Sequence, residues 1–308
     1  MKALLFPGQG SQFVGMGKDF FDKFDIVKKI FKDTDQKLNY NLSKIILEGP
    51  ENDLKLTKNT QPAILTISYS IFQLMKEEFN IELKNFKYFA GHSLGEYSAL
   101  VSSGSLDFLD ALYLLHERGK SMQDAVPPGT GSMLAVMGMQ LEELEKLVQG
   151  QNNDLGICEI ANDNSDGQII LSGHKKAIDN INITLKKIKK RSIFLPVSAP
   201  FHCSLMKPAA EKMEEKINNT NFKNPKISLV ANVTAEEVSN FEKIKNLLVK
   251  QIVSRVRWRE SVLYMIEQGV NEFIEIGPGK VLSGLVKRID DKVSSKSINT
   301  IEEIKTLK

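Results

Sequence analysis

A serine fenced by two glycines is the first feature with chemical potential, in the pattern Gly91-His92-Ser93-Leu94-Gly95. A short aromatic and apolar run precedes it, and apolar residues at helical spacing follow it. Glycines allow a tight strand-to-helix turn that lifts the serine out at the end of the strand. The following helix would then point N–H groups toward developing negative charge. The pattern also occurs in plain loops, but its strand and helix favour a nucleophilic serine.

A serine hydroxyl needs a general base to become a good nucleophile. The chain has four histidines, which are His92, His116, His174 and His202. His92 adjoins Ser93, and neighbours on a sharp turn tend to point apart. His116 is expected on a helix surface and His174 at the start of a helix. His202 lies in a loop behind a proline and ahead of a helix, a usual place for catalytic groups. Elimination therefore predicts His202 as the base.

A second glycine-containing loop, "FPGQGSQ", follows the first apolar run of the chain. A dinucleotide-binding fingerprint starting at Gly8 would require a glycine at position 13, which is Phe13. That interpretation therefore fails. The loop is either a plain turn or a carrier of a polar group to a site. In the second case Gln9 or a neighbour would supply half of an oxyanion hole, and the Leu94 N–H the other half.

Arg118 shares an apolar helical face with Leu112, Leu115 and Met122. No acidic residue stands three or four positions away on that helix. A buried, unpaired guanidinium costs several kcal/mol, so Arg118 must either pair with a distant buried carboxylate or await an anionic ligand. The pattern alone favours the structural pair. In both cases the planar guanidinium suits a bidentate carboxylate.

The elements that must position these residues follow an α/β rhythm before residue 125 and after residue 199. This rhythm predicts a mostly parallel sheet with helices on both faces. Between them the order is strand, helix, strand, strand, helix, strand, which is a ferredoxin-like pattern. We therefore expect a large α/β subdomain over 1–125 and 199–308, with a small subdomain over 126–198 inserted into it. Strands are expected at 2–6, 86–90, 132–139, 155–161, 167–173, 191–198, 226–232 and 271–277.

The composition is that of an ordinary globular protein, with 308 residues, 42% hydrophobic, 26% charged and a net charge of +3. So mild a charge argues against nucleic-acid binding. Two cysteines make no disulfide framework and no metal-ligand spacing. No apolar run could span a membrane or serve as a signal peptide, so we expect a cytoplasmic protein. Basic residues at 185–191 and at Arg255, Arg257 and Arg259 are candidates for meeting an acidic partner, although solvated surface is the commoner role.

Five motifs together resemble the malonyl-CoA:acyl carrier protein transacylases of type II fatty acid synthesis. They are "FPGQGSQ", "GHSLGEYSAL", "ERGKSMQ", "APFHCSLMKPA" and "IGPGKVLSGLVKRI". They stand in the family's order, cover nearly the whole chain and show no departure at a chemical position. The resemblance implies an α/β-hydrolase-like large subdomain, a ferredoxin-like small one and a site between them. It also implies a cytoplasmic monomer without metal or bound cofactor. Its substrates would be malonyl-CoA and the phosphopantetheine arm of acyl carrier protein, with no nucleic acid or membrane as partner.

The resemblance also implies roles for individual residues. Ser93 would carry the malonyl group, His202 would be the base, and the backbone carbonyl of Gln251 would be the third member of the relay. The oxyanion hole would consist of the N–H groups of Gln9 and Leu94. Arg118 would hold the free carboxylate of malonyl. The pocket would be lined by His92, Met122, Phe201 and Asn162. In related acyltransferase domains a phenylalanine at the position of Phe201 goes with malonyl, and a serine there with methylmalonyl.

Two other functions use parts of the same pattern. A serine hydrolase would have the same turn but would discharge its acyl group to water. Arg118 and the lack of an obvious acidic partner for the histidine argue against it. A non-catalytic subunit that docks carrier proteins would have no need of both Ser93 and His202. The lifetime of an acyl-serine in buffer distinguishes a hydrolase, which loses the acyl group within seconds, from a transferase, which keeps it until a thiol arrives. A failure to label the protein with malonyl-CoA would favour the docking subunit.

Overall fold

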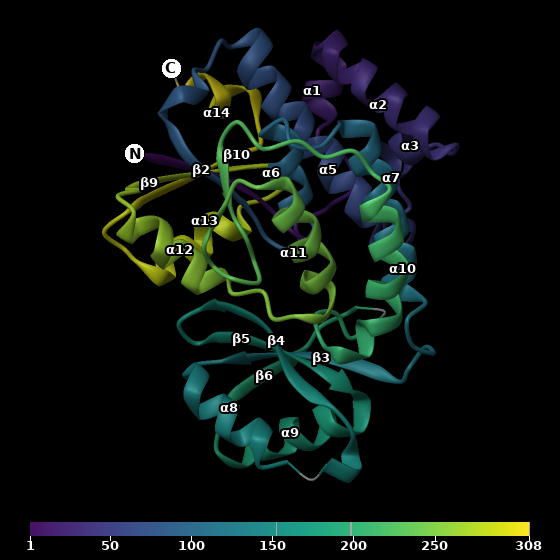
Figure 1. Cartoon of the computed structure of the whole chain (residues 1–308), viewed down its shortest axis with the longest axis vertical. Helices are drawn as coiled ribbons and strands as arrows, with labels where there is room; N and C mark the ends of the chain where they lie inside the picture. The colour runs from purple at the N-terminus through teal and green to yellow at the C-terminus, as the bar shows by residue number, and fades with distance from the viewer. Residues whose placement is uncertain (152, 198, 308) are drawn as a thin grey trace.

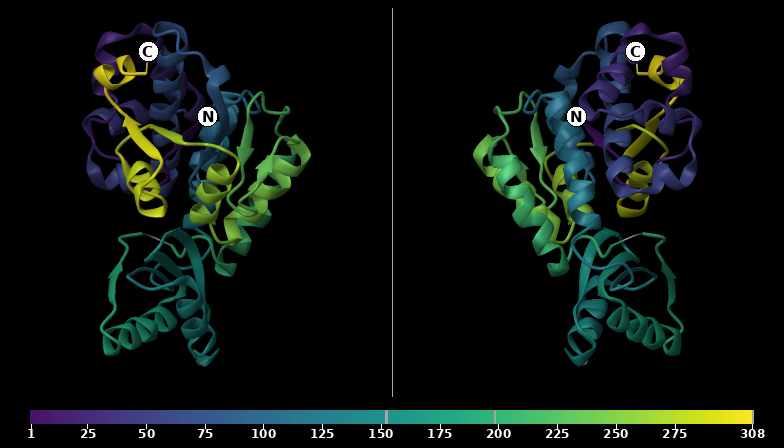
Figure 2. Two further views of the ribbon diagram at one scale, coloured as in Figure 1. Left: turned by 90° about the vertical axis from the view of Figure 1, so that its left-hand side faces the viewer. Right: turned by 90° about the vertical axis from the view of Figure 1, so that its right-hand side faces the viewer.

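The computed structural model describes residues 1–151, 153–197 and 199–307. They form two sheets, six-stranded with the order β10-β9-β1-β2-β7-β8 and four-stranded with the order β4-β5-β3-β6. The two sheets belong to two bodies stacked along the long axis of the molecule (Figures 1 and 2). In the described ranges no helix is both long and apolar enough to cross a membrane.

The larger sheet is mostly parallel, as predicted. Strands β1 (Lys2–Phe6), β2 (Phe86–Gly91), β7 (Ser228–Val230), β9 (Glu272–Ile276) and β10 (Ser294–Ile298) are parallel to their neighbours. Only the two-residue edge strand β8 (Glu237–Val238) runs antiparallel. Since β1 and β2 are central and covered on both faces, they read as continuous apolar runs.

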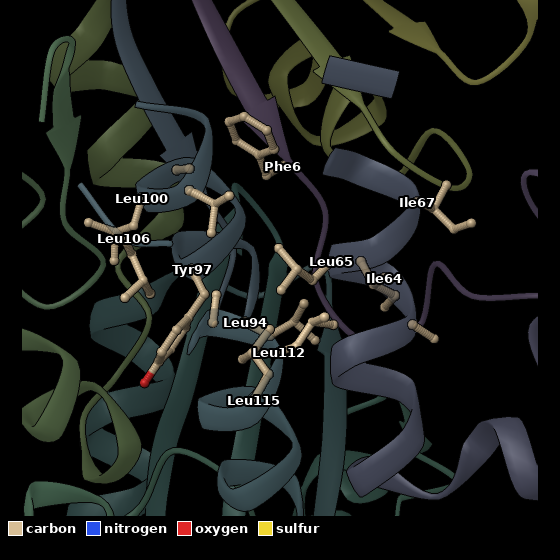
Figure 3. Packing of buried hydrophobic residues seen from close by; sticks show 14 of the residues in the cluster. Phe6, Ile64, Leu65, Ile67, Leu94, Tyr97, Leu100, Leu106, Leu112 and Leu115 are labelled. Atoms are coloured by element: carbon tan, nitrogen blue, oxygen red, sulfur yellow. The ribbon is translucent and has the colours of Figure 1, made fainter. Parts of the chain in front are cut away.

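Helices cover both faces of this sheet. In chain order they are α1 (Lys18–Lys23), α2 (Asp25–Leu38), α3 (Leu42–Glu48), α4 (Glu51–Lys55), α5 (Thr57–Gln73), α6 (Gly95–Ser102), α7 (Phe108–Gln123), α10 (Lys207–Asn218), α11 (Phe241–Val253), α12 (Trp258–Glu267), α13 (Val281–Ile289) and α14 (Ile301–Lys305). Alternate residues of β1 enter two separate cores, Leu4 and Phe6 on one face and Ala3 and Leu5 on the other. Figure 3 shows the first core, where α5, α6 and α7 pack together.

The smaller sheet has the predicted ferredoxin-like order. Its elements are β3 (Gly131–Met137), α8 (Leu141–Gln149), β4 (Cys158–Ser165), β5 (Gln168–His174), α9 (Lys175–Lys187) and β6 (Arg191–Phe194). All strand pairs are antiparallel. The last strand ends four residues before the predicted end, Ser198, which lies outside the described residues, as does Lys308.

The two bodies are fastened to each other at β4. The Val256 N–H donates to the Ala161 carbonyl at 2.8 Å, and the Asp163 N–H donates to the Val256 carbonyl at 3.0 Å. Beside this short parallel bridge, Arg259 pairs with the buried carboxylate of Asp163 at 3.0 Å. The chain enters and leaves the small body at one place, where a Cβ on Gly131 would lie 2.2 Å from Pro200 Cγ.

The same region contains three arginines that the sequence offered as candidates for an acidic partner. Arg255, Arg257 and Arg259 were candidates for contact with an acidic partner, but all three are held by carboxylates of this chain. Arg255 pairs with Glu145 at 3.0 Å, Arg257 pairs with Glu260, and Arg259 pairs with Asp163. The pairs of Arg255 and Arg259 therefore join the two bodies, whereas the pair of Arg257 lies within the large body.

Candidate active site

The turn that carries Ser93 is built by close packing. Strand β2 ends at Gly91 and helix α6 begins at Gly95, with Ser93 in the left-handed region at a φ of 54°. A Cβ on Gly91 would lie 1.9 Å from the Gly95 carbonyl carbon, and a Cβ on Gly95 would lie 2.2 Å from the Phe6 carbonyl oxygen. No larger residue fits at either place. The two glycines are therefore explained by backbone approach, and the result is a nucleophile elbow.

Ser93 and His202 meet across this turn. The Ser93 hydroxyl lies 2.7 Å from His202 Nε2, and His202 Nδ1 lies 2.9 Å from the Gln251 carbonyl oxygen. A carbonyl oxygen can only accept, so the Nδ1 atom carries the hydrogen and the Nε2 lone pair faces the serine. This tautomer is the one that can take a proton from the hydroxyl. Like Ser93, His202 has a left-handed backbone, with a φ of 57°.

His202 is 5% exposed, and its surroundings favour the neutral ring. Burial is the main cause that lowers the pKa of His202 to about 3, and the charge of Arg118 adds to it. The hydrogen bond to the Gln251 carbonyl acts in the opposite direction. The imidazole therefore stands ready as a base at neutral pH, without first having to lose a proton.

Backbone donors lie beside the same hydroxyl. Gln9 and Leu94 line the cavity into which Ser93 and His202 face. Within the described ranges, neither the Gln9 N–H nor the Leu94 N–H donates to an acceptor of the protein. Leu94 also caps the N-terminus of α6, where helix N–H groups and the positive end of the dipole point outward. The place can therefore receive negative charge on an oxygen.

Arg118 reaches the same cavity from α7, with 1% of its surface exposed. Its Nη1 donates to Gln61 Oε1 at 2.8 Å, and its Nη2 donates to Gln251 Oε1 at 2.8 Å and to Ser93 Oγ at 3.2 Å. Its Nε has no partner in the described chain, and no carboxylate there forms a direct ion pair with it. A buried guanidinium with only neutral partners is suited to an incoming anion.

The cavity holds the remaining predicted side chains. It has a volume of about 110 Å³ and includes His92, Met122, Asn162 and Phe201 in its wall. The small body supplies Met133, Leu195 and Val197 in addition to Asn162, so the site lies between the two bodies. His92 contacts other groups than Ser93 Oγ: its Nε2 lies 2.9 Å from Asn164 Oδ1, and its ring packs on Trp258.

The other two histidines lie in different places. His116 is half-buried beside Tyr40, with Nδ1 at 3.2 Å from the Lys58 carbonyl, and is therefore less exposed than the sequence predicted. His174 precedes α9 and accepts a hydrogen bond from the Ile157 N–H at 2.8 Å. Neither lines the cavity.

Three buried polar residues of the site were not anticipated from the sequence. Gln61 lies in α5 and Glu96 in the first turn of α6, both on buried parts of their helices, and Asn232 follows strand β7. Asn232 Oδ1 accepts from the Ser93 N–H at 2.7 Å, and its Nδ2 donates to the Gly91 carbonyl at 2.7 Å. The position of Asn232 at the carboxyl end of a parallel strand was an available signal.

Comparison with known proteins places this geometry in a family. The family model for the acyl transferase domain matches residues 3–304. Malonyl CoA-acyl carrier protein transacylase of Bacillus subtilis is 43% identical over 303 residues, which is 98% of this chain and 94% of that protein. In the described part of the chain, no group of three or more His, Cys, Asp or Glu side chains could hold a metal ion.

Solved structures agree with the sequence relatives. An acyl-carrier-protein-S-malonyltransferase from Bartonella henselae superposes with a TM-score of 0.96 at 42% identity, covering 99% of this chain and 97% of that one. A malonyl-transacylase in complex with a type II PKS acyl-carrier protein superposes with a TM-score of 0.95 at 39% identity, covering 99% and 98%. The chain, with its elbow serine, its histidine and its buried arginine, belongs to the acyl transferase domain family and, within it, to the malonyl CoA-acyl carrier protein transacylases.

Proposed function

We propose that the chain transfers the malonyl group of malonyl-CoA to the phosphopantetheine thiol of holo acyl carrier protein, through a malonyl ester of Ser93. The carrying observation is the distance of 3.2 Å between Arg118 Nη2 and Ser93 Oγ. An acyl group on Ser93 can place its own carboxylate on that guanidinium only if the group is short. Malonyl, with its carboxylate two bonds from the ester carbonyl carbon, meets this requirement.

In the first half-reaction Ser93 Oγ attacks the thioester carbonyl carbon while its proton passes to His202 Nε2. The Gln251 carbonyl stabilises the imidazolium that forms, through the Nδ1 hydrogen bond of 2.9 Å. The N–H groups of Gln9 and Leu94 receive the negative charge on the carbonyl oxygen. The intermediate collapses, the C–S bond breaks, and His202 returns the proton to the departing CoA sulfur.

The second half-reaction reverses these steps with another thiol. The phosphopantetheine thiol gives its proton to His202 and attacks the malonyl ester, and Ser93 Oγ leaves and regains the proton. All proton transfers use residues of this chain, so the proposal includes no bound cofactor. The malonyl-loaded carrier would supply fatty acid chain elongation. We further propose that the protein acts as a monomer in the cytoplasm, where CoA esters and carrier proteins meet.

The wall of the cavity supports a choice of malonyl over bulkier groups. Phe201 and Met122 lie in that wall beside Arg118, and 7% and 1% of their surfaces are exposed. A branch on the carbon between the two carbonyl groups of the acyl chain would have to displace such close-packed side chains. His92 and Asn162 complete the polar side of the wall. These four residues are proposed to select the acyl group, and Arg118 to hold its charge.

Intact-mass measurement tests the proposal. The protein incubated with malonyl-CoA should gain the mass of one malonyl group on Ser93, keep it in buffer, and lose it when holo acyl carrier protein is added. Ser93→Ala should remove the adduct without unfolding the chain. Cys203→Ser is the matched control, since Cys203 adjoins the base and is the nearest alternative nucleophile in sequence. An adduct on Cys203, rapid hydrolysis in buffer, or no adduct at all would each overturn the proposal.

A further inference from the structure

Glu96 is a buried carboxyl group to which the proposed mechanism gives no role. It lies in the first turn of α6 with 3% of its surface exposed. Its Oε2 accepts hydrogen bonds from Gln251 Nε2 at 2.7 Å and from the Asn232 N–H at 3.3 Å. Burial raises the pKa of Glu96 to about 7, while these hydrogen bonds and the charge of Arg118 act in the opposite direction. The group can therefore change its protonation state near neutral pH.

One amide connects this carboxyl to the arginine of the pocket. Gln251 donates to Glu96 through Nε2 and accepts from Arg118 Nη2 through Oε1, both at contact distances of 2.7–2.8 Å. Glu96, Gln251 and Arg118 thus form a row of carboxylate, amide and guanidinium. The row polarises the amide in one direction, because the amide donor faces the negative group and the amide acceptor faces the positive one. Glu96 is thus coupled to Arg118 without touching the cavity.

The charge balance around Arg118 changes when an acyl group with a carboxylate arrives. Before substrate binds, no carboxylate of the described residues pairs directly with the guanidinium, and an ionised Glu96 supplies the compensating charge through the Gln251 side chain. A bound malonyl carboxylate would pair with Arg118 directly. Two buried carboxylates around one buried cation leave an excess negative charge, which is costly at low dielectric.

We propose that Glu96 is a positioning residue that neutralises Arg118 through Gln251 in the empty site and takes up one proton from solvent when the malonyl carboxylate binds. This inference rests on the proposed function. Glu96 also has a second effect. Its hydrogen bond fixes the side chain of Gln251, and the main-chain carbonyl of the same residue holds His202.

The surroundings of Glu96 contain few other charges that could take this role. Arg118 comes from α7, and Tyr97 on α6 itself packs on the Arg118 guanidinium at 5.9 Å from its ring. The neighbouring β1, β2 and α5 carry Lys2, Lys87 and Lys58 as their charged residues, none of which is buried. Helix α11, which supplies Gln251, carries the charged residues Glu242, Lys243, Lys245 and Lys250, and the pocket contains His92 and His202.

Proton counting on a binding-only protein tests the inference. Ser93→Ala protein can bind malonyl-CoA but cannot be acylated, so heat measured in two buffers of different ionisation enthalpy reports protons taken up on binding. At pH 7.5–8 we expect net uptake approaching one proton with malonyl-CoA and none with acetyl-CoA, which has no carboxylate. Equal proton counts for the two esters would overturn the inference, and this comparison requires no change at Glu96.

A pair of carboxyl variants locates the proton. Ser93→Ala/Glu96→Gln should bind malonyl-CoA without proton uptake, because an amide at position 96 is always neutral. Glu275→Gln, in the same background, is the matched control: Glu275 is 1% exposed, accepts from the Leu282 and Ser283 N–H groups, and does not line the cavity. It should leave the malonyl proton count unchanged. Uptake that persists in the Glu96 variant would assign the proton elsewhere.

The pH profile of acylation gives an independent readout on the protein with Ser93 intact. Above the titration of Glu96, malonyl kcat/KM should fall by up to about tenfold per pH unit, and acetyl kcat/KM should not. Glu96→Gln should remove this slope for malonyl. If Glu96 had a purely structural role, Glu96→Gln would lower kcat/KM for both substrates at every pH. A failure of the proposed function can be told apart from a failure of this inference, since malonyl-CoA would then add no malonyl mass to Ser93.

Discussion

Gln251 holds the base with its main chain and the arginine with its side chain. Its carbonyl accepts from His202 Nδ1, its Oε1 accepts from Arg118, and its Nε2 donates to the Ser93 carbonyl at 3.0 Å. The proposed nucleophile, base and anion-binding group therefore all contact this one residue. A carbonyl in this role, unlike an aspartate, adds no negative charge beside the substrate carboxylate that Arg118 is proposed to hold.

The burial of His202 determines the expected acid limit of acylation. The neutral ring is the active form, and its pKa is lowered to about 3, so acylation should stay near its plateau well below pH 6.5. His202→Ala should slow acylation by about two to four orders of magnitude. Stopped-flow acylation between pH 4 and 8 measures both effects, with His116→Ala and His174→Ala as controls that should stay near the unaltered rate.

A half-maximal rate at about pH 6.5, the ordinary value for histidine, would contradict this expectation. The folded fraction must be followed at each pH. The unfolded chain takes up the histidine proton near 6.5 and the folded chain only near 3, so this residue makes folding less favourable as pH falls through that window.

Arg118 should separate malonyl from acetyl transfer. Removing one partner of a desolvated charge pair costs about 2–5 kcal/mol, which corresponds to roughly 30- to 4,000-fold in rate. Arg118→Ala should lose malonyl transfer by that factor and acetyl transfer little. Arg118→Lys should recover only part, because an ammonium lacks the bidentate fork. Steady-state rates with both esters decide the matter, and the exposed Arg288→Ala is the control. Equal losses for both esters would make Arg118 a structural residue.

At the scale of elements, the carboxyl ends of β1 and β2 and the N-terminus of α6 build the reaction centre, and α7 and α11 bring the arginine and Gln251 to it. Helices α5 and α7 pack closely because Gly119 lies on their contact. A Cβ there would lie 2.6 Å from Lys58 Cα. This close approach allows both Gln61 from α5 and Arg118 from α7 to enter the same cavity.

Two helical glycines should respond in opposite ways to alanine. Gly284 in α13 has no atom within 4 Å of an added Cβ, so Gly284→Ala should raise the free energy of unfolding by about 0.5–1 kcal/mol through helix propensity. Gly119→Ala meets the α5 backbone and should lower it by about 1–3 kcal/mol. Urea titration of both variants measures the difference. A shift of the same sign in both would contradict the packing argument.

The sequence predicted elements well where the hydrophobic pattern was strong and poorly elsewhere. The run over 86–90 and the helix after it were predicted because a buried parallel strand is apolar throughout. Strand β10 was not predicted, since its sequence, Ser-Ser-Lys-Ser-Ile, is polar and lies at the edge of the sheet. The short helices between residues 18 and 55 also received no prediction. Their amphipathic faces become meaningful only against the core that they cover.

Individual site residues divide in the same way. Ser93 and His202 stand in loops with local signals, and Arg118 is an anomaly on an apolar face, so each could be singled out from the sequence. Glu96 meets Asn232 and Gln251 across 136 and 155 residues of the chain. No local pattern contains that information, so side-chain amides and a buried carboxyl were missed.

At the scale of the whole molecule, the ion pairs at β4 should contribute to stability. Arg259→Ala leaves the carboxylate of Asp163 buried without its partner, since that side chain is only 1% exposed. We expect a loss of about 3 kcal/mol in the free energy of unfolding, at the low end for a buried pair because Arg259 is itself 22% exposed. Urea titration tests it.

The exposed pair of Lys175 with Asp179 is the matched control, and Lys175→Ala should change stability by less than about 1 kcal/mol. Asp163→Asn combined with Arg259→Ala should recover part of the loss, because no unpaired charge then remains buried. Equal effects of Arg259→Ala and Lys175→Ala would show that the junction pair contributes no more than a surface pair.

The crowding of Gly131 against Pro200 has a consequence for how such a molecule can vary. The small body is one inserted segment whose two ends lie side by side at Gly131 and Pro200. Such a segment, here called the cassette, can be replaced without changing the path of the remaining chain. This cassette carries Met133, Asn162, Leu195 and Val197 into the wall of the cavity, whereas the serine, the histidine and the arginine stay with the host. Replacing this segment would therefore alter one wall of the acyl chamber, while the reacting groups and the wall formed by His92, Met122 and Phe201 would stay in place.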